Sequence, residues 1–168
     1  MVGLATLMVG LDQWTKFLVQ RSIEFGGAID VAPGLFRLVH WGNTGAAWSL
    51  FQNQNAILAV VSSLAMVALV WFRDHFEGRR PLGRVALGLI LGGIVGNLLD
   101  RLRHGHVVDF LYFYLDRPNG SEAGFPAFNV ADSSICVGVG LLFILAWRPD
   151  RTSVSEESED PTPQAVDG

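Results

Sequence analysis

The sequence has a single cysteine and few charged side chains among its 168 residues. One cysteine, Cys136, excludes an internal disulfide and any metal site made of several cysteines, and its apolar neighbours indicate a small buried side chain. A His-Glu-x-x-His pattern is absent too, and His104 and His106 stand two positions apart, so the ligands of a metalloprotease are missing. The 12 lysine and arginine residues form no stripe that could follow a phosphate backbone, which removes nucleic acid from the expected partners.

Hydrophobic residues, by contrast, make up 50% of the chain, charged residues only 17%, and the mean hydropathy is +0.35. These values are typical of a membrane protein. The net charge of −4 belongs to the end of the chain, where five acidic residues gather: Glu156, Glu157, Glu159, Asp160 and Asp167. We expect one membrane domain over residues 1–148 and a disordered acidic tail over residues 149–168.

Four apolar runs are long enough to cross a membrane as helices, since a bilayer core takes about 20 residues. They cover roughly residues 1–20, 55–72, 82–101 and 130–147. The first run lacks the basic leader of a cleaved signal peptide and contains Asp12 and Lys16, so we interpret it as a span. In the third run Gly88, Gly92 and Gly96 recur every four residues, which predicts a face where another helix approaches closely.

Basic residues in short loops predict the orientation of the spans. They follow the second run at Arg73, Arg79, Arg80 and Arg84, and the fourth run at Arg148 and Arg151. Those ends should face the cytoplasm. Both termini are then cytoplasmic, and residues 21–54 and 102–129 are extracytoplasmic.

The first outer segment carries two further predictions. Apolar residues alternate over residues 28–39, with a break at Pro33-Gly34, which indicates a small sheet at the membrane surface. Residues 46–51 include Trp48 and Phe51 and favour a short interfacial helix. The predicted fold is thus an all-α membrane protein: four transmembrane helices with a small extracytoplasmic β-sheet and an interfacial helix.

Charged side chains inside apolar spans cost about 2.5 to 3.5 kcal/mol each and therefore indicate function. The topology brings several polar residues to the outer half of the bilayer: Asp12, Lys16, Asn43, Asn97, Asp100, Arg101, Asp109, Asn129 and Asp132. Asn129 is placed to cap the fourth helix, with Asp132 three residues later at the positive end of the helix dipole. Asp109 is flanked by Val108 and Phe110, an unusual setting for a solvated loop carboxylate.

Two carboxylates in a low-dielectric site share a proton, and this suits them to hydrolyse a peptide bond. The ionised member takes a proton from water while the protonated member polarises the scissile carbonyl. We predict that Asp109 and Asp132 form such a pair. Asp132 lies at a helix terminus and is the expected ionised member, although a coupled pair titrates as a unit.

The other polar residues are predicted to support this pair. Asp12 and Lys16, four residues apart, are interpreted as a self-satisfied ion pair. Asn97 and Arg101 share a helix face with Asp100 beside them, which fits either a neutralised helix end or a contact with substrate. Further amide and backbone donors near the site are offered by Asn43 and Gly45.

Five short motifs follow one another between residues 12 and 133. They are DQWTK at 12–16, NTGAAW at 43–48, GGIVGNLLDR at 92–101, VVDF at 107–110 and FNVADS at 128–133. Each motif alone is weak, but the ordered set is specific. It resembles signal peptidase II, the bacterial lipoprotein signal peptidase, which is an aspartyl protease.

The resemblance implies four transmembrane helices in the bacterial cytoplasmic membrane, a small outer sheet and a helix lying on the membrane. It implies a prolipoprotein substrate with diacylglycerol on the cysteine after the cut, contact with membrane lipids, no metal or cofactor, and inhibition by globomycin-type cyclic peptides. The catalytic aspartates of the family match Asp109 and Asp132. Its other polar motif residues match Asp12, Asn43, Gly45, Asn97, Arg101, Asn129 and Ala131.

Two alternatives remain open on the residues alone. A serine protease could use Ser133 or Ser134 with Lys16 as its base. A small proton-coupled transporter or channel could use intramembrane aspartates as a relay, although such proteins usually have repeated halves and none is visible here.

Overall fold

The computed structural model describes residues 1–45, 53–74, 81–118 and 120–147. In chain order its elements are α1 (Val2–Ser22), β1 (Ala28–Ala32), β2 (Phe36–Asn43), α2 (Asn55–Trp71), α4 (Pro81–His104), β3 (Val107–Asp116), β4 (Glu122–Gly124) and α5 (Val130–Trp147). The predicted interfacial helix at 46–51, the basic residues Arg79, Arg80, Arg148 and Arg151, and the acidic tail at 149–168 lie outside the described residues.

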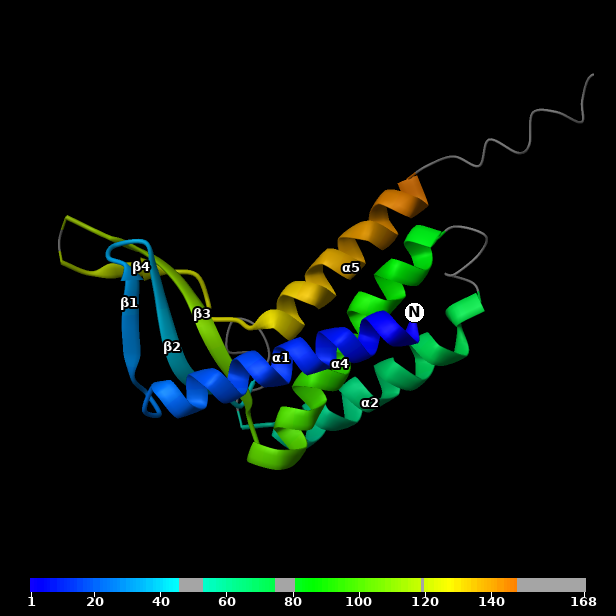
Figure 1. Cartoon of the computed structure of the whole chain (residues 1–168), viewed down its shortest axis with the longest axis horizontal. Coiled ribbons are helices and arrows are strands. Elements are labelled where there is room, and N and C mark those ends of the chain that lie inside the picture. Colours follow the sequence, from blue (N-terminus) through cyan, green and yellow to red (C-terminus); the bar gives the residue numbers. More distant parts are fainter. Residues whose placement is uncertain (46–52, 75–80, 119, 148–168) are drawn as a thin grey trace, which may run out of the picture.

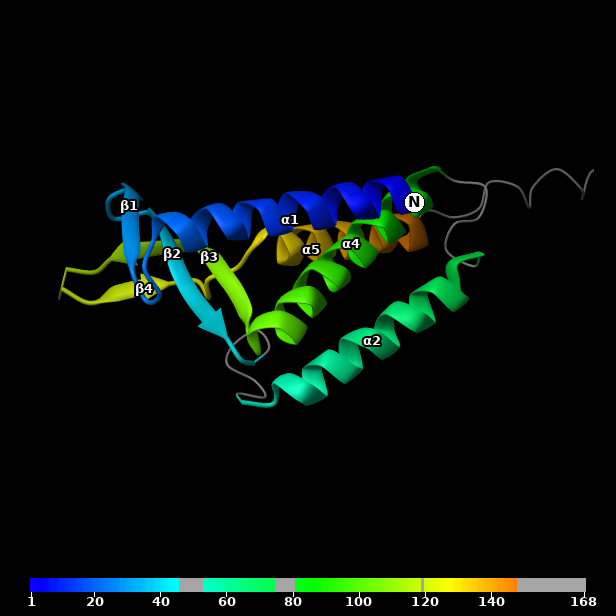
Figure 2. The ribbon, with the colours of Figure 1, turned by 60° about the horizontal axis from the view of Figure 1, so that its bottom comes forward.

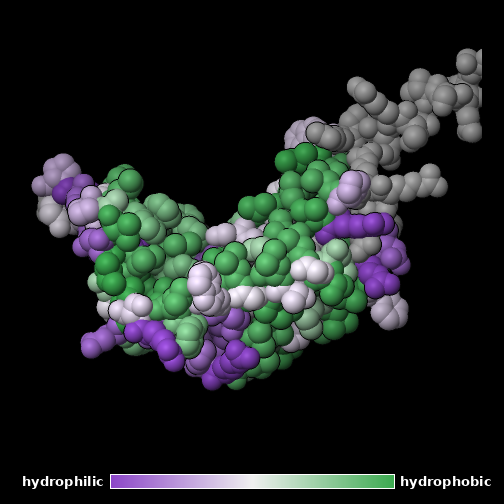
Figure 3. Space-filling model, viewed as in Figure 1, coloured by the Kyte–Doolittle hydropathy of each residue, from purple (hydrophilic) through white to green (hydrophobic). Residues whose placement is uncertain are grey.

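Each of these long helices coincides with a predicted apolar run to within a few residues. Within the described ranges, α4 and α5 are long and apolar enough to cross a membrane, and α2 is a shorter apolar helix. Hydrophobic side chains cover much of the helical surface (Figure 3), and α2 buries none of its residues. An apolar surface of this extent is expected of a membrane protein.

Helix α4 lies at the centre and packs against α1, α2 and α5 (Figures 1 and 2). The predicted glycine face makes the contact with α1. A Cβ at Gly92 would lie 2.7 Å from the Cβ of Met8, and a Cβ at Gly88 would lie 3.1 Å from that of Leu4. Small residues thus let the two backbones approach, as the four-residue spacing predicts.

The four strands form one antiparallel arrangement in the order β1-β2-β3-β4 (Figure 1). A small antiparallel sheet accompanies the helices, as predicted, and it extends beyond the predicted strand region. The strand prediction covers residues 28–39 only, whereas β3 continues the sheet after α4 and turns back as β4. The polar stretch at 116–123 therefore belongs largely to a hairpin.

The connection between α4 and β3 places the functional residues. Gly105 follows the last residue of α4 with φ of +75°, the left-handed conformation that ends many helices, and its N–H donates to the carbonyl of Arg101. The chain reverses there, so β3 runs back beside the end of α4. Phe110 of β3 then packs with Val19 of α1 and with Ile23 just after it, which fixes the sheet on this helix.

Candidate active site

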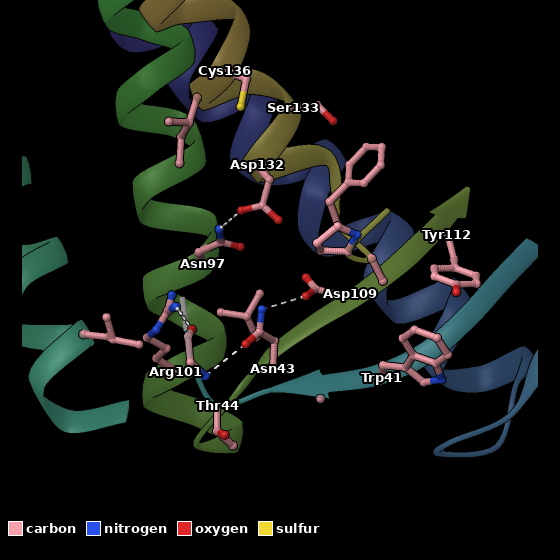
Figure 4. Close-up of a pocket in the computed structure, with 18 of the residues that line it drawn as sticks. Trp41, Asn43, Thr44, Asn97, Arg101, Asp109, Tyr112, Asp132, Ser133 and Cys136 are labelled. Carbon is pink, nitrogen blue, oxygen red and sulfur yellow. Dashed lines mark hydrogen bonds between the residues drawn. The ribbon is translucent and has the colours of Figure 1, made fainter. Parts of the chain in front are cut away.

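A cavity of about 1130 Å³ lies between the sheet and helices α2, α4 and α5. Asp109 and Asp132 both line it, and Figure 4 shows their carboxyl groups facing the same space. Cys136 lines it too and is exposed, so the prediction that this thiol is buried was wrong. Four residues after Asp132, it lies on the cavity face of α5.

Asp109 is the third residue of β3 and only 3% exposed. Its Oδ2 accepts a hydrogen bond of 3.0 Å from the side-chain amide of Asn43, at the end of the neighbouring strand β2. Its Oδ1 accepts one of 2.9 Å from the side-chain amide of Asn129, which immediately precedes α5. The carboxyl group is therefore held from two sides.

Asp132 lies in the first turn of α5, and the predicted cap of this helix is confirmed. The Oδ1 of Asn129 accepts a hydrogen bond of 2.9 Å from the backbone N–H of Asp132, while the Oδ2 of Asp132 accepts one of 3.3 Å from the backbone N–H of Asn129. This is the reciprocal pattern of a capping box. The Oδ1 of Asp132 accepts a third bond, 2.7 Å long, from the amide of Asn97 on α4.

Burial raises the pKa of Asp109 from its ordinary 3.8 to about 7, and the negative charge of Asp132 acts in the same direction. The hydrogen bonds from Asn43 and Asn129 oppose this shift without cancelling it. Near neutral pH the carboxyl group of Asp109 is therefore present in both its protonated and its ionised form. A carboxyl group in this state can serve as either acid or base.

Arg101 lines the same cavity from α4. One of its terminal N–H groups donates to the backbone oxygen of Gly45 at 3.2 Å, whereas its buried Nε has no partner among the described residues. The N–H of Gly45 donates at 2.9 Å to the Oδ1 of Asn43. The three predicted residues thus form one contiguous edge of the cavity.

Asp12 and Lys16 form the predicted ion pair, but the prediction that they satisfy only each other was wrong, because Lys16 also binds two residues of α4. The ammonium of Lys16 lies 2.8 Å from the Oδ2 of Asp12, 2.7 Å from the Oδ2 of Asp100 and 3.0 Å from the Oδ1 of Asn97. Lys16 and the two aspartates are each at most 2% exposed. Periodicity along α1 identifies the partner four residues away, but it cannot identify the partners on α4.

The two aspartates that bind Lys16 also form hydrogen bonds with α5 and β3, the elements that carry Asp132 and Asp109. The Oδ1 of Asp12 accepts a hydrogen bond of 2.9 Å from the backbone N–H of Ala131, and the Oδ2 of Asp100 accepts one of 3.1 Å from the N–H of Val108. The predicted residues that line the cavity are Asn43, Gly45, Asn97, Arg101, Asp109 and Asp132. Lys16 and Asn129 contact lining residues directly, and Asp12 and Asp100 lie behind them as partners of Lys16.

The serine alternative is not supported by the geometry. Ser133 donates to the carbonyl of Asn129 at 2.9 Å, and Ser134 donates to the carbonyl of Ala131 at 2.8 Å. The ammonium of Lys16 has three oxygen partners instead. Ser134 also donates to the carbonyl of Leu89 on α4 at 3.1 Å. Both hydroxyls thus donate to backbone carbonyls, and Lys16 is not placed as their base.

Sequence reasoning missed two parts of the site. Gln13 donates to the Oδ1 of Asp100 at 2.8 Å and to the carbonyl of Gly96 at 3.2 Å, and its position directly after Asp12 was the only signal. The aromatic wall of the cavity, formed by Trp41, Tyr112, Phe125 and Phe128, gave none. It depends on the β3–β4 hairpin, which long-range strand pairing creates.

Comparison with known proteins identifies the family. The sequence model of the family described as Signal peptidase (SPase) II matches residues 4–148. The "Lipoprotein signal peptidase" of Syntrophotalea carbinolica is 43% identical over 150 residues, which cover 86% of this chain and 89% of that protein. That of Bacillus subtilis is 39% identical over 142 residues, covering 84% of this chain and 88% of the relative.

Two solved structures share this fold. A chain described as a bacterial membrane enzyme superposes with a TM-score of 0.75 at 29% identity, covering 95% of this chain and 92% of that one. A second, also described as a bacterial membrane enzyme, gives a TM-score of 0.72 at 30% identity and covers 86% of this chain and 90% of that one. The chain therefore belongs to the signal peptidase II family of aspartic peptidases.

Proposed function

We propose that the chain removes signal peptides from diacylglyceryl-modified prolipoproteins, cutting just before the lipidated cysteine, with Asp109 and Asp132 as the catalytic pair. The main support is the setting of the two carboxyl groups on one cavity. Each of their four oxygens accepts one N–H from an amide. None of these donors is a cation, so neither acid is locked into an ion pair within the described part of the chain.

A hydrolytic cycle follows from this arrangement. The ionised carboxylate takes a proton from a water molecule, whose oxygen attacks the scissile carbonyl, and the protonated acid donates its proton to the carbonyl oxygen. When the C–N bond of the tetrahedral intermediate breaks, the amine of the lipidated cysteine leaves with the proton from one acid, and the other acid takes back a proton from a hydroxyl of the intermediate. The pair then holds one proton again, as at the start.

The rest of the cavity supports a lipid-bearing substrate. Its lining between the helices includes Leu58, Ile94, Ile135 and Val137, an apolar surface that suits acyl chains. Acyl chains held there would keep the peptide bond beside the modified cysteine at a fixed depth. The N–H groups of Arg101 could hold a backbone carbonyl of the substrate in position.

We further propose that α1, α2, α4 and α5 all cross the bacterial cytoplasmic membrane, with both termini in the cytoplasm and the cavity toward the extracytoplasmic face. Figure 1 supports this orientation, because the N-terminus lies at the end of the helices opposite the sheet. Arg73 and Arg84 flank the ends of α2 and α4 that are remote from the sheet. The exposed apolar helix faces would contact lipid, and globomycin-type cyclic peptides are expected to occupy the cavity.

The test compares purified wild-type protein with the Asp109→Asn and Asp132→Asn variants on a prolipoprotein peptide with and without diacylglycerol on its cysteine. We expect cleavage only of the lipidated peptide and only by the wild type. Asparagine keeps the size of the side chain, so the variants should remain folded. Normal turnover by either variant would refute the catalytic pair.

The matched control is Asp116→Asn, in the same strand as Asp109 but exposed. This variant should cleave at the wild-type rate, since its carboxyl group does not line the cavity. Equal cleavage of lipidated and unlipidated peptide by the wild type would refute the proposed substrate.

A further inference from the structure

The catalytic candidates are held by three asparagine amides whose orientation matters. Asn43 and Asn129 donate to Asp109, and Asn97 donates to Asp132. A side-chain amide has a donor end and an acceptor end. If one of them turned by about 180°, its oxygen would face a carboxylate oxygen and the hydrogen bond would become a repulsion. Each amide therefore needs a second contact that fixes its orientation.

Each amide has such a contact at its oxygen. The backbone N–H of Gly45 donates to Asn43 at 2.9 Å, and the backbone N–H of Asp132 donates to Asn129 at 2.9 Å. For Asn97 the donor is the ammonium of Lys16, at 3.0 Å. Two of the three orienting groups are backbone, so they are supplied by the fold itself. The third is a side chain.

We infer that Lys16 is a positioning residue for Asp132, and that it acts through Asn97. The inference rests on the proposed function, because it gives a role within that reaction. An ammonium has only donors, so it accepts no hydrogen bond and cannot tolerate the turned amide of Asn97. Its charge also polarises the amide and strengthens the N–H that reaches Asp132 at 2.7 Å.

Lys16 is itself fixed by the groups around it. Asp12 on its own helix and Asp100 on α4 bind two of its N–H groups, at 2.8 and 2.7 Å, and leave the third for Asn97. All of these are buried. An ion pair needed only for stability would be complete with the aspartates. The contact with Asn97 adds a connection from α1 to the reacting groups.

The experiment is a double-mutant cycle of Lys16→Met and Asn97→Ala, read as kcat and KM on the lipidated peptide. We expect Lys16→Met to lower kcat by roughly 100-fold, as a misplaced catalytic group does, with KM within about twofold. In the Asn97→Ala background, Lys16→Met should lower kcat by less than about threefold, because the amide through which Lys16 acts on Asp132 is already absent. A full loss in both backgrounds, or wild-type kcat in Lys16→Met, would overturn the inference.

Removing Lys16 leaves two buried carboxylates, so the single variant could fail to fold. The triple variant D12N/K16M/D100N is free of charge in this cluster and keeps carbonyl oxygens for the N–H groups of Ala131 and Val108. We expect it to fold and to show the same loss of kcat. Wild-type kcat, or a failure of both variants to fold, would make Lys16 a structural residue only.

A further variant, Asn97→Asp, keeps the oxygen that Lys16 binds but removes the N–H that Asp132 accepts. It should remain folded, with kcat as low as in Asn97→Ala. Wild-type kcat in this variant would overturn the inference. These outcomes can be told apart from a failure of the proposed function itself. In that case the wild type would be inactive on the lipidated peptide, or the Asp132→Asn variant would be active.

Discussion

The Oδ1 of Asp12 accepts a hydrogen bond of 2.9 Å from the backbone N–H of Ala131, 119 residues further along the chain. The first N–H groups of a helix have no partner within the helix, and Ala131 is the second residue of α5. A carboxylate from α1 supplies the missing acceptor. The start of the helix that carries Asp132 is thereby held against α1.

Loss of this carboxylate should destabilise the whole protein. Asp12→Ala removes the partner of Ala131 and one of the two anions beside Lys16, so we expect a loss of about 3 to 5 kcal/mol in unfolding free energy. Thermal unfolding in detergent measures it. The control is Asp74→Ala, whose carboxyl group is 89% exposed and which should leave the melting temperature unchanged. Equal melting temperatures for the two variants would contradict the prediction.

Peptidase activity should fall as the pH rises through about 7. The reaction needs one proton on the pair, and the pKa of Asp109 is raised to about 7 by burial and by the charge of Asp132. Above this pH both carboxyl groups become ionised. The measurement is kcat against pH on the lipidated peptide, and a profile that stays flat up to about pH 9 would contradict the assignment.

The same shift predicts how stability depends on pH. Between about pH 4 and pH 7 Asp109 stays protonated in the folded protein but is ionised in the unfolded chain, so the folded state binds more protons. The contribution of Asp109 to stability is therefore complete below about pH 4 and is lost as the pH rises through about 7. Asp109→Asn removes this pH-dependent contribution, because asparagine does not ionise. As the pH rises from about 4 to about 7, the melting temperature of the variant should therefore rise relative to that of the wild type. A difference in melting temperature that does not change with pH would count against the raised pKa of Asp109.

The contact between α1 and α4 should not tolerate a methyl group. A Cβ at Gly92 would lie 2.7 Å from the Cβ of Met8 and 2.9 Å from the carbonyl oxygen of Ala5, so Gly92→Ala should cost about 1 to 3 kcal/mol. The matched control is Gly10→Ala on α1, where nothing lies within 4 Å of the added Cβ. That substitution should be neutral or stabilise by about 0.5 to 1 kcal/mol. Both changes can be followed by thermal unfolding, and the same sign for both would be unexpected.

Ser133→Ala and Ser134→Ala should each retain peptidase activity within about twofold. Both hydroxyls donate to backbone carbonyls, and Lys16, the only base proposed for them, is held by three other oxygens. The measurement is the rate at which each variant cleaves the lipidated peptide. A hundredfold loss in either variant, with folding intact, would restore the serine mechanism.

The helices were predictable because their signals are local. Four long apolar runs, the glycine spacing at 88, 92 and 96, and the cap at Asn129 all depend on neighbours within one helix, and the structure confirms each. The meeting of Asp109 and Asp132 on one cavity also agrees with the prediction from topology. Their catalytic roles remain predictions.

Features that depend on distant neighbours were predicted poorly. The partners of Lys16 on α4 are 81 or more positions away, and no periodicity on α1 could identify them. The β3–β4 hairpin arises from pairing of Tyr114 with Gly124 and of Asp116 with Glu122, and the mostly polar residues 116–123 carry no alternating pattern that predicts it. Cys136 was misjudged because an apolar run does not distinguish a packed helix face from one that lines a cavity.

The placement of α2 has a consequence for how a substrate arrives. This helix packs against α4 (Figure 2), and residues of both α2 and α5 line the cavity. Leu58 and Ser62 line the cavity on one side, and Ile135 and Val137 line it on the other. Under the proposed function, a lipid-anchored polypeptide would reach this space by two-dimensional diffusion within a leaflet. Encounter rates should therefore scale with the mole fraction of substrate per lipid, and diluting the bilayer with inert phospholipid should slow turnover even when the bulk concentration is constant.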